Sequence, residues 1–346
     1  MRDVARVGLG FGTWRLFLAL CVASSHLWAD MLHGPAAYAV WAFFVLSGFL
    51  MTHVLQHKYG LTAEGVRSYA FNRFLRIFPG FWVACAIGAL VVLWLDSQSM
   101  NARLLNPAFG LPRNRQEWGF LATLLPVFPR MNAPVPLANA LSVEVGFYLL
   151  MPLLAAHRSS AWFALVFGML ITANFGFDST TFAERYALFL PAAPAFALGA
   201  LVCHYRARLD WLVSPGLSVA AWLLHTTIWL LWPYWPWTYG LYSATLLSAW
   251  VVLSLSGIKS SQADGVAGEL SYPFYLLHTS AGGALLPWFG YGRPLRFAVA
   301  ALLLTLAGSW LMVIAIDRPL ARRKRPAVVA KDFVIPASTA PATTIP

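Results

Sequence analysis

The sequence is short of charge, of acidic residues and of cysteine. Only 11% of its 346 residues are charged and its mean hydropathy is +0.65, whereas about a quarter of the residues in soluble domains are charged. This shortage excludes an ordinary water-soluble domain. The cysteines Cys21, Cys85 and Cys203 lie singly in apolar runs, which excludes a disulfide framework and a cysteine metal site. We interpret them as small apolar packing residues.

Acidic residues are outnumbered by basic ones, 13 to 24, which gives a formal charge of +11. A basic chain can indicate a nucleic-acid partner, but here Lys and Arg fall mostly in short loops between apolar runs. That distribution is typical of membrane topology. We therefore expect the lipid bilayer, and no nucleic acid, as a partner of this chain.

Long apolar runs predict an all-α integral membrane protein. A bilayer core of about 30 Å needs about 20 residues of helix. Runs of this kind predict a bundle of about ten transmembrane helices, near residues 7–27, 36–55, 77–95, 137–156, 161–177, 186–204, 211–232, 239–257, 270–288 and 295–316. A further run at 118–128 is too short to cross, and we expect it at the interface or re-entering the membrane.

The placement of Lys and Arg predicts the orientation. Ten crossings put both termini on one side, and with the termini inside, 15 Lys and Arg fall in inner segments and seven in outer ones. The positive-inside rule therefore favours N-in and C-in. We expect residues 1–325 to form the transmembrane domain, and the outer segment 96–136 to line an entrance for a polar acceptor. Residues 326–346, rich in Pro, Ala and Thr, are expected to be a disordered tail.

The first run contains Arg15 and His26, two side chains that are costly inside hydrocarbon. Eleven residues at about 100° each bring both to one helix face, about 16 Å apart along the axis. This spacing predicts a single polar track, comparable in length with the pantetheine arm of coenzyme A. An arginine that snorkels to the inner surface and a histidine that caps a helix end fit the spacing as well.

Two arginines, Arg73 and Arg76, follow the second run on the predicted inner side. On a helix they lie on one face, and paired guanidinium groups suit the binding of phosphate. Positive-inside anchoring beside anionic headgroups fits equally well. Within the second run, Ser47 and Gly48 stand between bulky residues, which we interpret as close helix packing because no nucleophile elbow surrounds the serine.

Glu144 is the only acidic residue of the fourth run. An unpaired carboxylate in lipid is very costly, so we expect it to face the bundle interior and to find a cation or hydroxyl partner. Arg15 and Arg76 are candidates. A structural ion pair and general acid–base work both fit this residue.

The ninth run brings Ser271, Tyr275 and His278 near one helix face. A histidine that serves helix packing fits this pattern as well as a functional one. At the end of the tenth run, Asp317 lies next to the predicted inner surface and is expected to hold a basic partner.

The order of these motifs is more informative than any one of them. An Arg and a His separated by ten residues are followed by FFVLSGF, RxxRIxP, SVExxFY and LSYPFYLLH. This order, which runs from Arg15 to Pro319, resembles that of the acyltransferase 3 family of bacterial membrane O-acyltransferases. The resemblance implies a bundle of about ten helices in the bacterial cytoplasmic (inner) membrane. It also implies transfer of acetyl or related groups to hydroxyls of envelope polysaccharides, lipid-linked sugars, peptidoglycan or secondary metabolites.

The resemblance also implies roles for individual residues. His26 is expected to be the catalytic residue, with Arg15 as its companion and Glu144 as a polar residue of the catalytic core. Arg73 and Arg76 are expected to contact the phosphates of a cytoplasmic acyl-CoA, most simply acetyl-CoA, and no metal is expected. The late motif supplies further substrate-site residues, Ser271, Tyr272 and His278.

The chain departs from the family pattern in two motifs. Gly146 stands where many relatives have Gln or Glu, and Asp317-Arg318-Pro319 where many have Glu-x-Pro. An SGNH-type soluble domain follows the last helix in some relatives but is not found here, so we expect transfer to the acceptor directly or through a separate envelope protein.

Two other functional classes remain open from the sequence. A transporter or flippase for a lipid-linked sugar also places charge inside a multi-helix membrane protein, although no internal repeat is visible. A structural scaffold in envelope assembly is the third class, and it predicts that Arg15 and His26 tolerate substitution. For an enzyme, His26 is expected to act either as a base or as a transient carrier of the acyl group.

Overall fold

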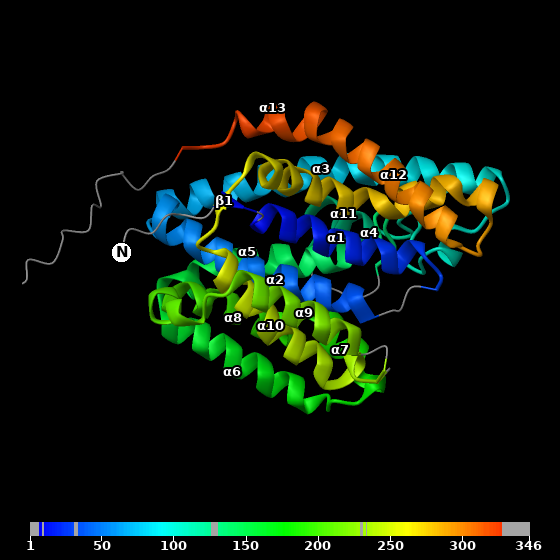
Figure 1. The fold of residues 1–346 in the computed structure, drawn as a ribbon. Coiled ribbons are helices and arrows are strands. Elements are labelled where there is room, and N and C mark those ends of the chain that lie inside the picture. The colour runs from blue at the N-terminus through cyan, green and yellow to red at the C-terminus, as the bar shows by residue number, and fades with distance from the viewer. Residues whose placement is uncertain are drawn as a thin grey trace, which may run out of the picture.

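The computed structural model describes residues 7–8, 10–30, 34–125, 131–228, 231–232 and 234–326. Within these ranges the chain is almost entirely helical (Figure 1), with helices α1 (Phe11–Leu27), α2 (Gly34–Val54), α3 (Ala63–Ser97), α4 (Arg115–Thr123), α5 (Ala138–Ala156), α6 (Arg158–Asn174), α7 (Phe182–Ala187), α8 (Phe189–Tyr205), α9 (Pro215–Ile228), α10 (Leu241–Leu255), α11 (Gln262–Phe289), α12 (Leu295–Met312) and α13 (Arg318–Ala321). The tail predicted to be disordered comprises residues 326–346, of which 327–346 lie outside the described ranges.

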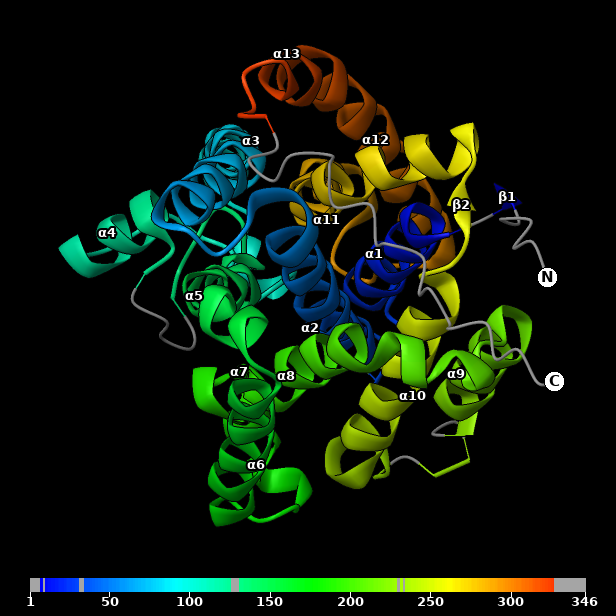
Figure 2. The ribbon, with the colours of Figure 1, turned by 90° about the vertical axis from the view of Figure 1, so that its left-hand side faces the viewer.

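Helix α2 lies at the centre of the bundle. It packs against α1, α5, α8 and α10, while α11 packs against α1, α3 and α12 (Figure 2). The contact between α2 and α8 depends on two glycines, because a Cβ on Gly48 would meet the carbonyl of Phe196 and a Cβ on Gly199 would meet that of Val45. This contact confirms the predicted packing role of Gly48.

The first turns of α1 and α11 are tied together, and the two helices run parallel. Strands β1 (Val7–Gly8) and β2 (Lys259–Ser260) form a short parallel pair that leads into both helices. The carboxylate of Asp264 then accepts hydrogen bonds from the backbone N–H groups of Gly10 and Thr13, both at 2.7 Å. Since the N-cap position of α1 is a glycine, Asp264 caps that helix from a neighbouring one.

The outer helices expose large apolar side chains that no other helix covers, including Phe163 and Leu170 on α6 and Leu303 and Leu311 on α12. In water this surface would cost about 25 cal/mol for each Å², so it faces lipid. Five of the described helices are long and apolar enough to cross a membrane, or six if the bent pair Arg158–Asn174 and Ser179–Ala187 counts as one span. The chain is thus an all-α, multi-pass membrane protein.

Each of the ten predicted runs coincides with a helix of the described structure: α1, α2, α3, α5, α6, α8, α9, α10, α11 and α12. Several of these, such as α9 with 14 residues, are short for a bilayer. Ten crossings, and the N-in and C-in orientation, stay predictions.

Candidate active site

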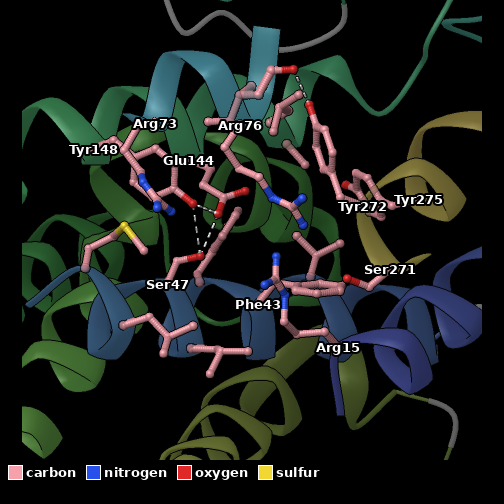
Figure 3. A pocket seen from close by; sticks show the side chains of 18 of the residues that line it. Arg15, Phe43, Ser47, Arg73, Arg76, Glu144, Tyr148, Ser271, Tyr272 and Tyr275 are labelled. Carbon is pink, nitrogen blue, oxygen red and sulfur yellow. Dashed lines mark hydrogen bonds between the residues drawn. The ribbon is translucent and has the colours of Figure 1, made fainter. Parts of the chain in front are cut away.

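A cavity of about 290 Å³ opens among five helices and beside the segment that follows α13. Polar groups from α1, α2, α3, α5 and α11 reach into it (Figure 3), and its polar lining consists of Arg15, Ser47, Arg73, Arg76, Glu144, Tyr148, Ser271, Tyr272, Tyr275 and Lys324. Six of the eight predicted site residues therefore meet in one place. The two that do not line this cavity are His26 and His278.

The cavity wall has an excess of positive charge. Arg15 and Arg76 extend from opposite walls toward its middle (Figure 3). Arg15 forms no hydrogen bond or ion pair with another described residue, and the buried Nε of Arg73 has no partner there either. Guanidinium groups without protein partners in a shared cavity favour an anionic ligand.

More charged groups gather at the end of the cavity that lies beside the segment after α13. Arg76 pairs with Asp317 at 3.5 Å, which confirms the predicted basic partner of that acid, and its guanidinium lies 5.6 Å from the ring centre of Tyr272. The pKa of Lys324, just beyond α13, is held below its usual value by partial burial and then by Arg76 and Arg73. The part of this lowering that comes from Arg76 and Arg73 is one that a bound anion would offset.

Glu144 finds hydroxyl partners rather than an arginine. Its carboxylate accepts hydrogen bonds from Ser47, at 2.5 Å, and from Tyr148 one helical turn along α5. Neither Arg15 nor Arg76, the cations named as candidate partners, forms an ion pair with it in the described structure. Ser47 therefore has a polar role in addition to its place in the packed helix.

Two residues of the late motif, Tyr272 and Ser271, donate hydrogen bonds from their hydroxyl groups to backbone carbonyls. Tyr272 donates to the carbonyl of Ile77 at 2.8 Å, which ties α11 to the turn of α3 that carries Arg76. Ser271 donates to Gly268 within its own helix at 2.9 Å. Their contacts position the cavity wall.

His26 and His278 form a pair of their own. His26 Nδ1 lies 2.9 Å from His278 Nε2, and the two ring planes are inclined by only 15°, with centroids 5.2 Å apart. His278 is completely buried, and its Nδ1 lies 2.9 Å from the carbonyl oxygen of Tyr275. The backbone carbonyl of His26 accepts a hydrogen bond of 2.8 Å from Arg293, in the loop between α11 and α12.

Tyr275 connects the cavity with the histidine pair. It lines the cavity, its ring lies 6.4 Å from that of His278, and on its other side it meets Phe43 at 6.0 Å. The expected continuous polar track from Arg15 to His26 is therefore divided, with the arginine in the cavity wall and the histidine behind an aromatic pair. Among the described residues, no group of three His, Cys, Asp or Glu is arranged to hold a metal ion.

Sequence reasoning missed three residues of this region. Tyr148 follows Glu144 by four residues, and that spacing was sufficient to name it. Lys324 belongs to a basic run that indicates topology, and Arg293 lies in a loop with a left-handed backbone at φ 46°, where no sequence signal points to a site.

Comparison with known proteins then decides the family. The model of the acyltransferase 3 family, described as an acyltransferase domain, matches residues 9–314. The chain belongs to this family. As a family member with lipid-facing helices, it is a membrane acyltransferase, and the resemblance stated from its motifs is confirmed.

Two curated relatives are similar to this acyltransferase. One is nodulation protein 10 of Rhizobium leguminosarum bv. viciae, 25% identical over 81% of this chain and 85% of its own length. The other is the putative peptidoglycan O-acetyltransferase YrhL of Bacillus subtilis (strain 168), 26% identical over 47% of this chain and 26% of its own length. No solved structure matches this acyltransferase.

Proposed function

We propose that this membrane acyltransferase moves an acyl group, most simply acetyl, from cytoplasmic acyl-CoA to a hydroxyl of an envelope glycan or lipid-linked sugar. The observation that carries the proposal is the cavity in which Arg15, Arg73 and Arg76 converge, two of them without protein partners. Coenzyme A carries several phosphate charges next to a long neutral arm, and this cavity offers a matching set of cations beside an apolar wall.

The same residues support a cytoplasmic entrance for the donor. The lining of the cavity includes Arg73, Arg76 and Lys324. These residues belong to segments that are rich in Lys and Arg, and the positive-inside rule assigns such segments to the cytoplasm. We infer an N-in and C-in orientation in a bacterial cytoplasmic membrane, with the donor entering from inside. The name of the Bacillus relative supports a cell-wall glycan as acceptor class.

The reaction is assigned to His26. The thioester passes Tyr275 to reach the imidazole, and an acceptor hydroxyl approaches from the outer side. If His26 acts as a base, its ring takes the hydroxyl proton, the oxygen forms a bond to the acyl carbon, the carbon–sulfur bond breaks, and the proton passes to the leaving thiolate. If it acts as a carrier, the ring nitrogen forms a bond to the acyl carbon while the carbon–sulfur bond breaks and the CoA thiolate leaves. The acceptor oxygen then forms its bond to the acyl carbon, the nitrogen–carbon bond breaks, and the hydroxyl proton passes to the thiolate.

Binding of radiolabelled acetyl-CoA to the purified protein in lipid nanodiscs tests the donor site. We expect Arg73→Gln and Arg76→Gln each to raise the Kd about tenfold or more, the size of a lost charged hydrogen bond. Arg67→Gln is the matched control, because Arg67 lies on the same helix, is exposed and does not line the cavity. Unchanged binding in the double variant would reduce both arginines to topology anchors.

Release of free CoA distinguishes an enzyme from a transporter. Membranes that contain the protein, labelled acetyl-CoA and envelope glycan should release CoA only when an acceptor is present, and His26→Ala should abolish that release. A flippase predicts no acceptor-dependent release. Full activity of His26→Ala at normal expression would remove His26 from the reaction.

A further inference from the structure

The histidine pair ends on a group that can only accept a hydrogen bond. The atom facing His278 Nδ1 is the carbonyl oxygen of Tyr275, one turn earlier on α11. A carbonyl oxygen has no proton to donate, so Nδ1 of His278 carries the hydrogen. In the neutral ring, the other nitrogen, Nε2, then has a lone pair.

The same reasoning applies to the ring of His26. The lone pair on His278 Nε2 faces His26 Nδ1 at 2.9 Å, so the hydrogen between them belongs to His26. His26 Nδ1 is thereby the protonated nitrogen. Its Nε2 remains as the nitrogen with a free lone pair.

We propose that His278 is a positioning residue that fixes His26 in the tautomer whose Nε2 is free to act as base or nucleophile. The inference rests on the proposed function of His26 and assigns the reacting atom within it. It also assigns a role to His278, which the sequence left open between helix packing and function. A free imidazole exchanges between two tautomers, and a wrong tautomer cannot take the proton of the acceptor.

The charges around the pair are consistent with a neutral resting state. On α11, His278 contacts His26 and in turn contacts the carbonyl of Tyr275. In the loop before α12, the guanidinium of Arg293 binds the carbonyl of His26. Neither imidazole contacts a carboxylate in the described part of the chain. When His26 takes a proton during the reaction, its hydrogen bond to His278 becomes charge-assisted and stabilises the imidazolium.

The register of the two helices keeps the rings in contact. Asp264 ties the start of α11 to Gly10 and Thr13 at the start of α1, and the histidines meet further along the same parallel pair. Gly12 allows this approach, since a Cβ there would meet the backbone of Asp264. The two rings are thus held together by their own hydrogen bond and by the contact of Asp264 with the start of α1.

Nitrogen NMR of protein labelled with ¹⁵N-histidine tests the tautomer directly. The signals of His26 are identified as those lost in His26→Gln. In the wild type we expect a protonated Nδ1 and an unprotonated Nε2, and in His278→Phe, which has no acceptor, we expect the Nε2-protonated form to appear. A wild-type spectrum with His26 protonated at Nε2 would overturn the proposal, whatever the activity of the protein.

Activity supplies the second readout. His278→Phe should lower the acyl-transfer rate about 10²-fold or more, the usual scale of general acid–base catalysis, with the KM for acetyl-CoA unchanged. His278→Gln places an amide oxygen near the lost Nε2 and should recover most of that rate, even where the Phe variant folds poorly. His225→Gln, a half-buried histidine on α9 that contacts Ser243, is the matched control and should retain wild-type activity.

The outcomes separate the two claims. If the wild type transfers no acyl group while the tautomer shifts as expected, the proposed function fails and the positioning role of His278 stands. If the wild type is active and His278→Phe and His278→Gln behave alike, with no change of tautomer, His278 serves only packing.

Discussion

Two arginines inside this bundle differ in how their charge is accommodated. Arg185 on α7 is completely buried, and every nitrogen of its guanidinium has a hydrogen-bond acceptor, drawn from Thr181, Asp178, Trp237, Thr238 and Tyr242. Three aromatic rings, of Phe177, Phe182 and Tyr242, lie within 5.9 Å of its central carbon. Carbonyl oxygens and ring faces thus replace the water that this cation has lost.

Arg15 on α1 has none of these partners. Its guanidinium enters the cavity opposite Arg76, and no described side chain or carbonyl accepts from it. A buried cation whose donors are all used stabilises the fold, whereas one whose donors face a cavity is available to a ligand. Arg15 lies within an apolar run and Arg185 just before one, and neither position shows which donors the protein itself will use, so the arrangement in space has to distinguish them.

The largest effect is expected from Arg185→Met. The change removes the hydrogen bonds that Arg185 donates to the carbonyl oxygens of Asp178, Trp237 and Thr238 and to the hydroxyls of Thr181 and Tyr242. A hydrogen bond from a charged group is worth about 1.5–3 kcal/mol, so the free energy of unfolding should fall by about 3 kcal/mol or more. The thermal midpoint in detergent, followed by tryptophan fluorescence, measures this loss. A midpoint equal to that of the wild type would mean that the hydrogen-bond network does not stabilise the fold.

Arg15→Met is the matched change in the cavity, and it should separate stability from activity. The substitution removes a charge that has no protein partner and that faces Arg76, so we expect an unchanged or raised thermal midpoint. Acetyl-CoA binding should weaken about tenfold or more, and transfer should fall with it. A midpoint lowered as far as that of Arg185→Met would break the comparison, because Arg15 would then be structural.

Much of the fold could be predicted from length and hydropathy alone. All ten apolar runs became helices, because a run of about 20 apolar residues has few other ways to satisfy its backbone in lipid. Which helices meet could not be predicted. The tie between Asp264 and Thr13 spans 251 residues, and no local pattern relates the two.

The candidate site, like the fold, could be predicted only in part from the sequence. Motif order brought Arg15, Arg73, Arg76 and Glu144 together correctly, and spacing placed each on a helix face. The hydrogen-bond partners of these groups come from other helices. One sequence therefore could not show that Glu144 binds the hydroxyl of Ser47 rather than an arginine. The pairing of histidines 252 residues apart was likewise beyond it.

The smallest expected effect concerns a satisfied carboxylate, Asp264, which lies before the apolar part of α11. Burial alone would raise the pKa of this group, but hydrogen bonds from Thr13, Ser260 and Gly10 outweigh it and hold the pKa below its usual value. The cap therefore stabilises the folded state fully above the unfolded pKa of about 3.9 and is lost as the pH falls through the lower folded value.

Asp264→Asn isolates this contribution. The amide oxygen of Asn can still accept hydrogen bonds but carries no charge. At pH 7 we therefore expect the free energy of unfolding to fall by up to about 1 kcal/mol, the usual worth of a negative charge at a helix N-terminus, and the difference from the wild type should vanish in acid. Thermal midpoints of both proteins between pH 7 and pH 3 measure it. Because Asp264 sets the register of α1 against α11, the variant should also broaden the ¹⁵N signals of His26, whereas Arg185→Met, on a distant helix, should alter the midpoint without that change. A gap between the two proteins that stays constant with pH would show that the carboxylate charge plays no part in the cap.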